Sequence, residues 1–236
     1  MKNPFRIVGS FALLVVIAGY TIAYSSPVIL NPSKHRKIDH TSSYAKEHEI
    51  KGVGVGNVIF SSHELPYKNE SAYTDIRDTF TWGKDTSLFA RSYYPGTMDS
   101  LKKMVKSQLS KAVYIEKWAR LEVYPEGDTR NVIRYSKQIL DEGADADQWD
   151  QQRFNLLPFH GADSPEQDFR FINLADKASL GGPGPKDVYI EVFIRFQTGT
   201  KRVTKAQSDG SVVTEDEPIF ADFLISHGKF KYVTSE

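Results

Sequence analysis

The chain contains no cysteine among its 236 residues. This absence excludes disulfides, a cysteine nucleophile and the lipid-modified cysteine that anchors a bacterial lipoprotein. A eukaryotic secreted domain of this size usually carries disulfides, whereas a bacterial envelope domain often has none. The composition therefore favours a protein of a bacterial cell envelope.

An excess of charge of either sign is also missing, since 30 basic residues stand against 30 acidic ones. Lys2 and Arg6 lie in the first 26 residues, which hold no acid, so the remainder has two more acidic than basic residues. A domain that binds nucleic acid usually has a strong basic patch. We therefore expect no nucleic-acid partner.

Complete motifs for several kinds of chemistry are absent as well. The chain has no G-x-S-x-G elbow, and His63-Glu64 lacks the second histidine of a zinc-binding H-E-x-x-H motif. The glycine-rich segment 52–58 departs from G-x-G-x-x-G, and the acidic segment 141–150 lacks the ligand spacing of a calcium loop. The sequence thus predicts neither a metal site nor a cofactor.

One long uncharged run is present, at residues 7–24, and it follows Lys2 and Arg6. Its length lies at the border between a secretory signal and a transmembrane helix. Three interpretations fit: an uncleaved anchor in the membrane, a cleaved signal peptide ending near residue 26, or a buried core helix. The first two place the rest of the chain outside the cytoplasm, in the periplasm or cell envelope, or secreted after cleavage.

The remaining sequence divides into two parts by composition. Residues 27–50 are polar with mixed charge and no apolar period, which predicts a polar tether behind the leader at 1–26. Residues 51–236 are long enough to bury a full core, and we expect them to form a single β-rich extracytoplasmic domain.

Strand patterns recur through this domain. The segment 52–60 alternates glycine with β-branched residues, which suits a strand that another backbone or ring approaches closely. Residues 113–124 alternate well, and 188–196 are apolar on both faces and should be central in a sheet. Further strands are predicted in pairs around turns at 83–85, 207–210 and 226–228.

Helices are expected between these strands. Apolar residues spaced by three and four from Met98 to Ala112 predict an amphipathic helix. Residues 147–157 are a second candidate, and Ser164-Pro165 resembles a helix N-terminus. The predicted fold class is α+β and β-rich: an antiparallel sheet or β-sandwich with two or three inserted helices, preceded by the hydrophobic targeting helix.

Three residues are candidates for catalysis. His160 and Asp163 share a loop between apolar segments, where catalytic groups often lie, although they also suit a role in loop stability. Glu191 lies in the most apolar strand, where an ionised carboxylate needs a partner such as Arg120 or Arg195. A salt bridge on the sheet surface is the structural alternative.

Aromatic residues in the N-terminal half are candidates for binding. If their rings share an exposed face, they would form a contact surface for carbohydrate or protein, and otherwise they belong to the core. The candidates are Trp82, Tyr93, Tyr94, Trp118 and Tyr124.

These observations favour a non-catalytic cell-envelope protein that presents a β-rich domain to a protein or polysaccharide partner. The alternatives are an extracytoplasmic hydrolase, with His160, Asp163 and Glu191 converging in a pocket, and a carrier of a small ligand. A large cavity would be the mark of a carrier.

Overall fold

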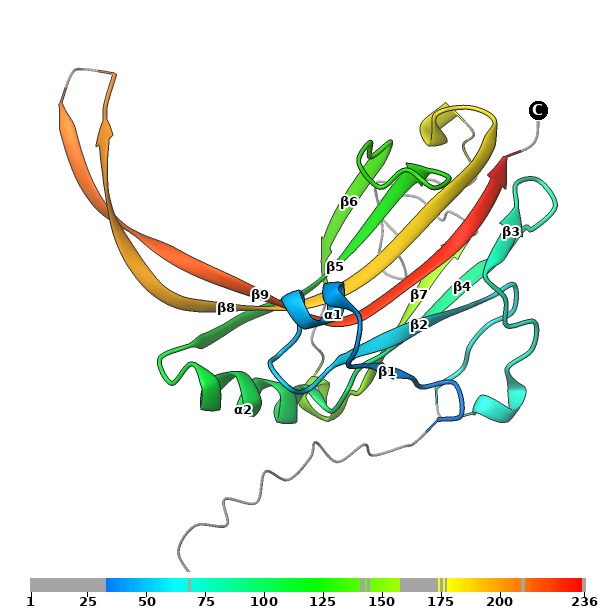
Figure 1. The fold of residues 1–236 in the computed structure, drawn as a ribbon, viewed down its shortest axis with the longest axis horizontal. Coiled ribbons are helices and arrows are strands. Elements are labelled where there is room, and N and C mark those ends of the chain that lie inside the picture. Colours follow the sequence, from blue (N-terminus) through cyan, green and yellow to red (C-terminus); the bar gives the residue numbers. More distant parts are fainter. Residues whose placement is uncertain are drawn as a thin grey trace, which may run out of the picture.

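The computed structural model describes residues 33–67, 69–140, 143, 145–157, 174, 176, 178–208 and 211–234 (Figure 1). The predicted leader at 1–26, with its membrane segment 7–24, lies outside the described residues. Among the residues that are described, no helix combines the length and the apolar character needed to span a bilayer.

The described chain is rich in strands and has two α-helices. The strands are β1 (Ile38–Asp39), β2 (Val55–Ser61), β3 (Thr79–Thr81), β4 (Leu88–Tyr93), β5 (Val113–Pro125), β6 (Arg134–Ile139), β7 (Gln151–Leu157), β8 (Gly184–Ala206) and β9 (Val212–Thr234). The helices are α1 (Ser43–His48) and α2 (Met98–Gln108), with single 3-10 turns at Glu70–Ala72, Ala146–Gln148 and Ala178–Leu180. The β-rich expectation is confirmed.

The strands form one curled sheet in the order β6-β5-β8-β9-β2-β4-β7, with β1 beside β2 and β3 beside β9 (Figure 1). Most neighbours are antiparallel, but β2 and β3 both run parallel to β9. The sheet is therefore mixed, where the sequence predicted an antiparallel sheet or a β-sandwich. The strand predicted at 188–196 lies within β8, which has β5 and β9 on its two sides, as expected.

One face of the sheet forms the main core. Alternate residues of β8 point into it, and they are Val188, Ile190, Val192, Ile194 and Phe196, all fully buried. Helix α2 begins behind Thr97, whose hydroxyl accepts a hydrogen bond from the Ser100 amide at 3.3 Å. Its buried residues Met98, Leu101 and Val105 join the same core, which confirms the predicted amphipathic helix.

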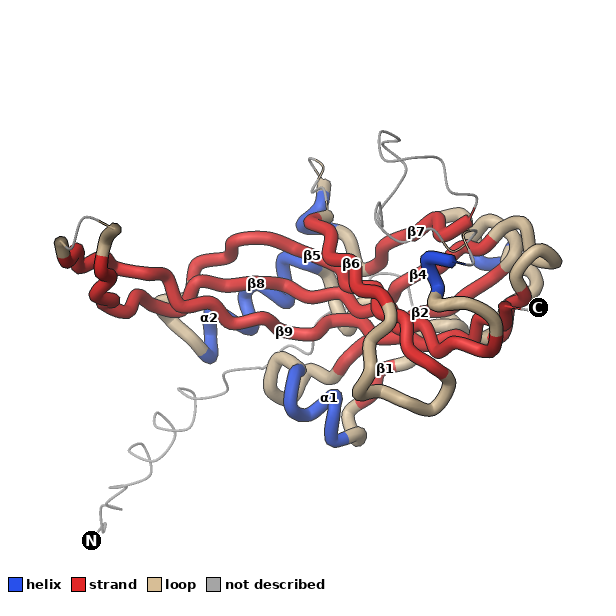
Figure 2. The backbone as a smooth tube through the Cα atoms, turned by 90° about the horizontal axis from the view of Figure 1, so that it is seen from above, coloured by secondary structure: helices blue, strands red, loops and turns tan. Residues whose placement is uncertain are grey.

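The other face of the sheet carries the remaining β8 side chains, Tyr189, Glu191, Phe193 and Arg195. Period-two alternation places these four opposite the core face. Helix α1 lies against part of this polar face, where Ala45 is buried among Val55, Trp118, Phe193 and Leu224 (Figure 2). The two faces of β8 thus have different roles, although both appeared mostly apolar in the sequence.

Residues 33–50 belong to the folded unit, although the sequence assigned them to a polar tether. Strand β1 pairs with β2, and Ile50 is buried in the main core. Arg36 forms an ion pair with Asp150 at 2.6 Å, with both side chains at most 3% exposed. Most charged side chains in 33–50 are exposed, so the sequence pattern indicated a solvated tether. The buried ion pair of Arg36 has no signal in that pattern.

Two predicted hairpins are wrong. The turn at 83–85 does not join paired strands, because β3 pairs with β9 while β4 pairs with β2 and β7. Asp85 explains the turn locally: its carboxylate accepts a hydrogen bond from the Thr81 amide and pairs with Arg77, both at 2.6 Å. Residues 226–228 form no turn, because β9 runs through them unbroken.

The expected helix at 147–157 is also wrong. A single 3-10 turn ends at Gln148, and residues 151–157 form β7. Pairing with β4 places Phe154 opposite Ala90, and both are fully buried. Tertiary pairing therefore overrides a local pattern that is ambiguous between helix and strand.

The predicted hairpin around 207–210 is confirmed, and it is much longer than expected. β8 and β9 pair from Gly184↔Thr234 to Ala206↔Val212. Their distal halves leave the rest of the sheet as a two-stranded ribbon, which we call the arm (residues 199–206 and 212–219) (Figure 1).

Candidate functional site

A cavity of about 930 Å³ lies between the α1 segment and the polar face of the sheet. Its walls come from β1, α1, β2, β5, β8 and β9. The lining side chains that are charged or that carry aromatic or hydrogen-bonding groups include Lys37, Asp39, Tyr44, Asn57, Arg120, Glu122, Tyr124, Tyr189, Glu191 and His227.

The charged centre of the cavity is Glu191. Arg120 lies opposite it on β5 and donates from Nε to Glu191 Oε2 at 2.7 Å, with Nη2 also in contact. The Tyr44 hydroxyl donates to Glu191 Oε1, and Arg120 Nη2 donates to the Tyr44 oxygen at 3.3 Å. Burial and this hydrogen bond to a carboxylate raise the pKa of Tyr44 well above its usual range. Helix α1 is thereby joined to the sheet through Glu191.

A second carboxylate, Glu122, lies two residues beyond Arg120 on the same strand face. It accepts a hydrogen bond from the Tyr124 hydroxyl at 2.9 Å and lies 3.7 Å from Arg120 Nη1. Burial, with the hydrogen bond to Glu122, raises the pKa of Tyr124 to about 12. Tyr124 therefore stays neutral at physiological pH.

His227 closes the β9 side of the cavity. Its Nε2 lies 3.8 Å from Glu191 Oε1, and its ring lies 5.3 Å from that of Tyr44 and 6.0 Å from that of Tyr189. Burial lowers the pKa of His227, although the charge of Glu191 opposes this shift. The imidazole is therefore neutral near pH 7 and offers one donor and one acceptor nitrogen.

The rim of the cavity is organised by Asp39. Its carboxylate accepts hydrogen bonds from the Thr41 amide at 2.8 Å and the Ser42 amide at 3.1 Å. Hydrogen bonds from Ser42 and Thr41 hold the pKa of Asp39 well below its usual range. Ser42 in turn caps α1 by accepting from the Ala45 amide at 3.0 Å. This chain of bonds positions Tyr44 over Glu191.

The ionised groups at the base of the cavity are thus bound to one another. Glu191 has no simple route to act as a base or nucleophile, because its oxygens already accept from Arg120 and Tyr44. The described residues hold no group of three or more metal-ligating side chains of the His, Cys, Asp and Glu types. What the cavity offers is tyrosine and histidine rings, amide and hydroxyl groups, and fixed charges.

Of the three catalytic candidates from the sequence, Glu191 lies among the described residues. Glu191 lies in the cavity with Arg120 as its partner, one of the two partners expected. The other, Arg195, pairs with Asp222 at 2.8 Å and with Glu116 at 3.0 Å. His160 and Asp163 lie outside the described residues.

The five aromatic candidates do not share one exposed face. Tyr93 and Tyr94 are fully buried, and Trp82 packs against the main core. Trp118 is 6% exposed and stacks on Phe193 at a centroid distance of 4.4 Å. Tyr124 alone among the five lines the cavity.

Sequence reasoning missed Tyr44, Tyr189 and His227. Tyr44 was assigned to the tether and His227 to a turn. For Tyr189 a signal existed, because Tyr189 and Glu191 alternate with fully buried aliphatic residues along β8. Reading the two faces of that strand separately would have placed them together on its polar side.

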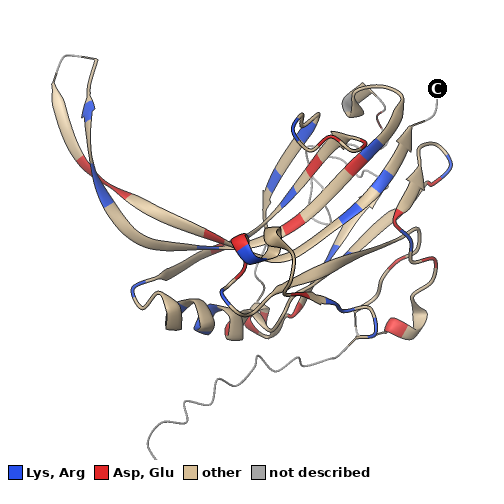
Figure 3. Cartoon of the chain, viewed as in Figure 1, with Lys and Arg blue, Asp and Glu red and all other residues tan. Residues whose placement is uncertain are grey.

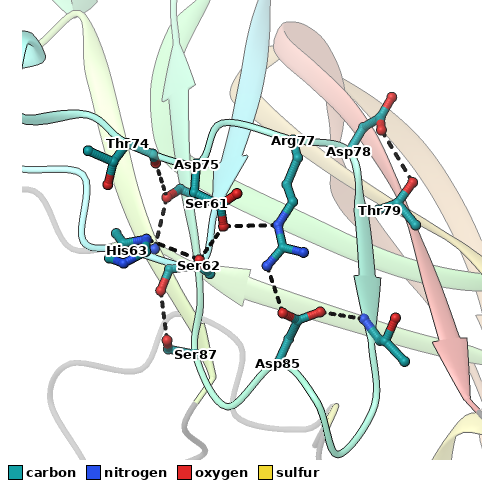
Figure 4. A network of polar contacts seen from close by, with 11 residues as sticks. Ser61, Ser62, His63, Thr74, Asp75, Arg77, Asp78, Thr79, Asp85 and Ser87 are labelled. Carbon is teal, nitrogen blue, oxygen red and sulfur yellow. Dashed lines mark hydrogen bonds and ion pairs between the residues drawn. The ribbon is translucent and has the colours of Figure 1, made fainter.

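A second polar cluster surrounds Ser62, on the loop after β2 (Figure 4). The Ser62 hydroxyl donates to Asp75 and lies 3.1 Å from His63 Nδ1, while Arg77 contacts Asp75 at 3.0 Å. These residue types match a hydrolase triad, but their order does not, because the carboxylate contacts the serine rather than the histidine. Arg77 continues the network to Asp85, so the cluster ties the loop to β3.

The cavity is therefore the candidate functional site. In comparisons with known proteins, no family model, no curated protein and no solved structure matches this chain.

Proposed function

We propose that the chain is a non-catalytic cell-envelope protein whose extracytoplasmic domain binds a saccharide, as a free sugar or a unit of a polysaccharide, in the cavity between α1 and the sheet. The observation that carries the proposal is the pairing of Glu191 with Arg120 and Tyr44 beneath tyrosine walls. Such a floor gives fixed hydrogen-bonding groups without a free catalytic group.

The size and lining of the cavity support this class of ligand. Binding sites for small ligands usually measure roughly 300–1,000 Å³, and this cavity measures about 930 Å³. A sugar presents C–H faces that pack on aromatic rings and hydroxyl groups that need donors and acceptors. Tyr189 and Tyr124 supply rings, His227 supplies a ring nitrogen, and the exposed Lys37 supplies an ammonium group.

The bonding of Glu191 argues against the hydrolase alternative. A glycosidase needs one carboxyl group that holds a proton and a second carboxylate that is free to attack or to activate water. Glu191 is 3% exposed and is engaged by a guanidinium and a hydroxyl, and Glu122 accepts from Tyr124. Each carboxylate therefore serves to hold its neighbours.

The envelope location is part of the proposal and rests on the sequence. Residues 7–24 are uncharged, follow Lys2 and Arg6, and would insert in the membrane as an anchor or a signal peptide. Fractionation with mass spectrometry of the N-terminus tests this point. An intact N-terminus in the membrane fraction, or a new one near residue 26 outside the cytoplasm, supports it; an intact soluble cytoplasmic chain contradicts it.

Ligand binding is tested by screening the purified protein against immobilised saccharides and measuring the strongest hits by calorimetry. Tyr189→Ala should weaken binding about tenfold or more, because it removes a wall of the site. Tyr67→Ala is the matched control, since Tyr67 is exposed and does not line the cavity. Cleavage of a bound saccharide, or equal effects of the two substitutions, would contradict the proposal.

A further inference from the structure

The arm is a ribbon of two strands that is unusually open to solvent. β5 pairs with β8 only as far as Gln197, and β2 meets β9 only at Ser226 and His227. Beyond these points, residues 199–206 and 212–219 form a ribbon with no third strand beside it among the described residues. A two-stranded ribbon is marginally stable alone, and its free edges offer unpaired N–H and C=O groups.

The two edges of the arm carry opposite charge. The β8 edge contains Lys201, Arg202 and Lys205, and the β9 edge contains Glu215, Asp216 and Glu217. Figure 3 shows basic and acidic segments along the arm. Within the ribbon they pair across the strands, as in Lys201–Glu217 at 3.4 Å and Lys205–Glu215 at 3.3 Å.

These pairs leave much of each charged side chain available to a partner. The side chains of Arg202 and Asp216 are 79% and 65% exposed, and their contact is a long 3.8 Å. Lys205 remains 50% exposed although it contacts both Glu215 and Glu217. Each edge therefore presents a row of one sign to solvent.

The residues between the charges favour further strand pairing. Val203, Thr204, Val212, Val213 and Thr214 are all β-branched, and such residues suit strands. Val212 is 65% exposed, so a strand paired beside it would remove apolar surface from water. Pro218 has no N–H, so the edge of β9 that is open to continuous pairing ends there.

We propose that the arm binds the arm of a second copy of this chain, with the β8 edge of one copy beside the β9 edge of the next. This arrangement places a basic row against an acidic row and continues the antiparallel ladder. Pairing of two β8 edges or of two β9 edges places like charges opposite each other, which is unfavourable. The contact is therefore heterologous, and it builds a ring or an open chain of copies.

A charge-swapped variant of the full-length chain tests the charge rule without unpairing the ribbon. It exchanges the signs of the two strands through Lys201→Glu, Arg202→Glu, Lys205→Glu, Glu215→Lys, Asp216→Lys and Glu217→Lys. Every cross-strand pair is retained in reverse, so the arm stays folded. Alone, this variant should associate as the wild type does in sedimentation velocity, and association of both should weaken by about tenfold or more between roughly 0.1 M and 1 M salt.

Mixing the two proteins gives the decisive result. Wild-type and charge-swapped copies should not co-assemble through the edges that each protein uses alone, because the β8 edge of one beside the β9 edge of the other would place like charges together. Carbodiimide cross-linking of mixed ¹⁴N- and ¹⁵N-labelled wild-type copies should join the segment 201–205 of one isotope to the segment 215–217 of the other. Joining of wild type to the variant through a β8 edge beside a β9 edge, an absence of links between the two isotopes, or a monomer at every concentration would overturn the proposal.

Discussion

Arg120 and Glu191 face each other on neighbouring strands and form an ion pair, in which the Glu191 side chain is 4% exposed and the Arg120 side chain is 26% exposed. The Tyr44 hydroxyl completes the group from α1, a segment that lies 147 residues away in the chain from Glu191. The same contacts therefore stabilise the domain and hold the walls of the cavity in place.

The first prediction concerns this pair. Glu191→Ala should lower the free energy of unfolding by about 2–3 kcal/mol, because it leaves Arg120 and Tyr44 without their acceptor in a largely buried place. Urea denaturation measures the change. Glu126→Ala is the control, since Glu126 pairs with Lys231 at an exposed site and should cost less than about 1 kcal/mol. Equal costs for the two substitutions would contradict the assigned role of Glu191.

The second prediction concerns the attachment of residues 33–50. Arg36→Ala removes a buried ion pair and leaves Asp150 charged and unpaired, which should cost about 3 kcal/mol. Amide exchange of β1 and α1 should also speed up, since this segment loses its anchor to the domain. Arg130→Ala, at a side chain 89% exposed, should leave both unchanged. Unaltered exchange in Arg36→Ala would show that the segment is held by other contacts.

The third prediction concerns Gly56, on β2. A Cβ at this position would lie 1.9 Å from the Tyr93 carbonyl oxygen, a backbone atom that cannot move aside alone. Gly56→Ala should therefore destabilise the domain by about 3 kcal/mol, at the upper end of overpacking costs. At Gly199 the nearest atom to a new Cβ is 3.9 Å away, so Gly199→Ala should cost much less in the same denaturation experiment. A tolerated alanine at Gly56 would refute this close approach of the two strands.

The fourth prediction concerns pH and His227. The unfolded chain protonates this histidine near its ordinary pKa of 6.5, whereas burial lowers the pKa in the folded state. Near and below pH 6.5 the unfolded state binds more protons than the folded state, so His227 makes the free energy of unfolding fall as the pH falls below about 7. His227→Gln should flatten this dependence in urea titrations at several pH values. His63→Gln is the control at an exposed site, and a flattening of equal size there would contradict the prediction.

The sequence predicted the elements whose patterns are strong and local. The strands at 113–124 and 188–196, the helix from Met98 and the hairpin around 207–210 all follow from side-chain period or turn chemistry that neighbouring residues supply. Their local preference and their tertiary role agree.

The elements that were missed depend on distant partners. β3 is only three residues long and is stabilised by parallel pairing with β9, about 150 positions away, which no local pattern encodes. Helix α1 is a short polar helix whose one buried residue is Ala45, so it has no amphipathic signature. The cavity shares this origin, since Tyr44, Arg120, Glu191 and His227 come from four elements that only the sheet order brings together.

The most direct test of the central claim is an amide NMR titration of the ¹⁵N-labelled protein with the tightest-binding saccharide. Binding in the cavity should give chemical-shift changes at Tyr44, Tyr189, Glu191 and His227, together with an unaltered saccharide after long incubation. Shifts confined to the arm or to the Ser62 cluster, or the appearance of cleaved sugar, would show that the cavity is not a non-catalytic saccharide site.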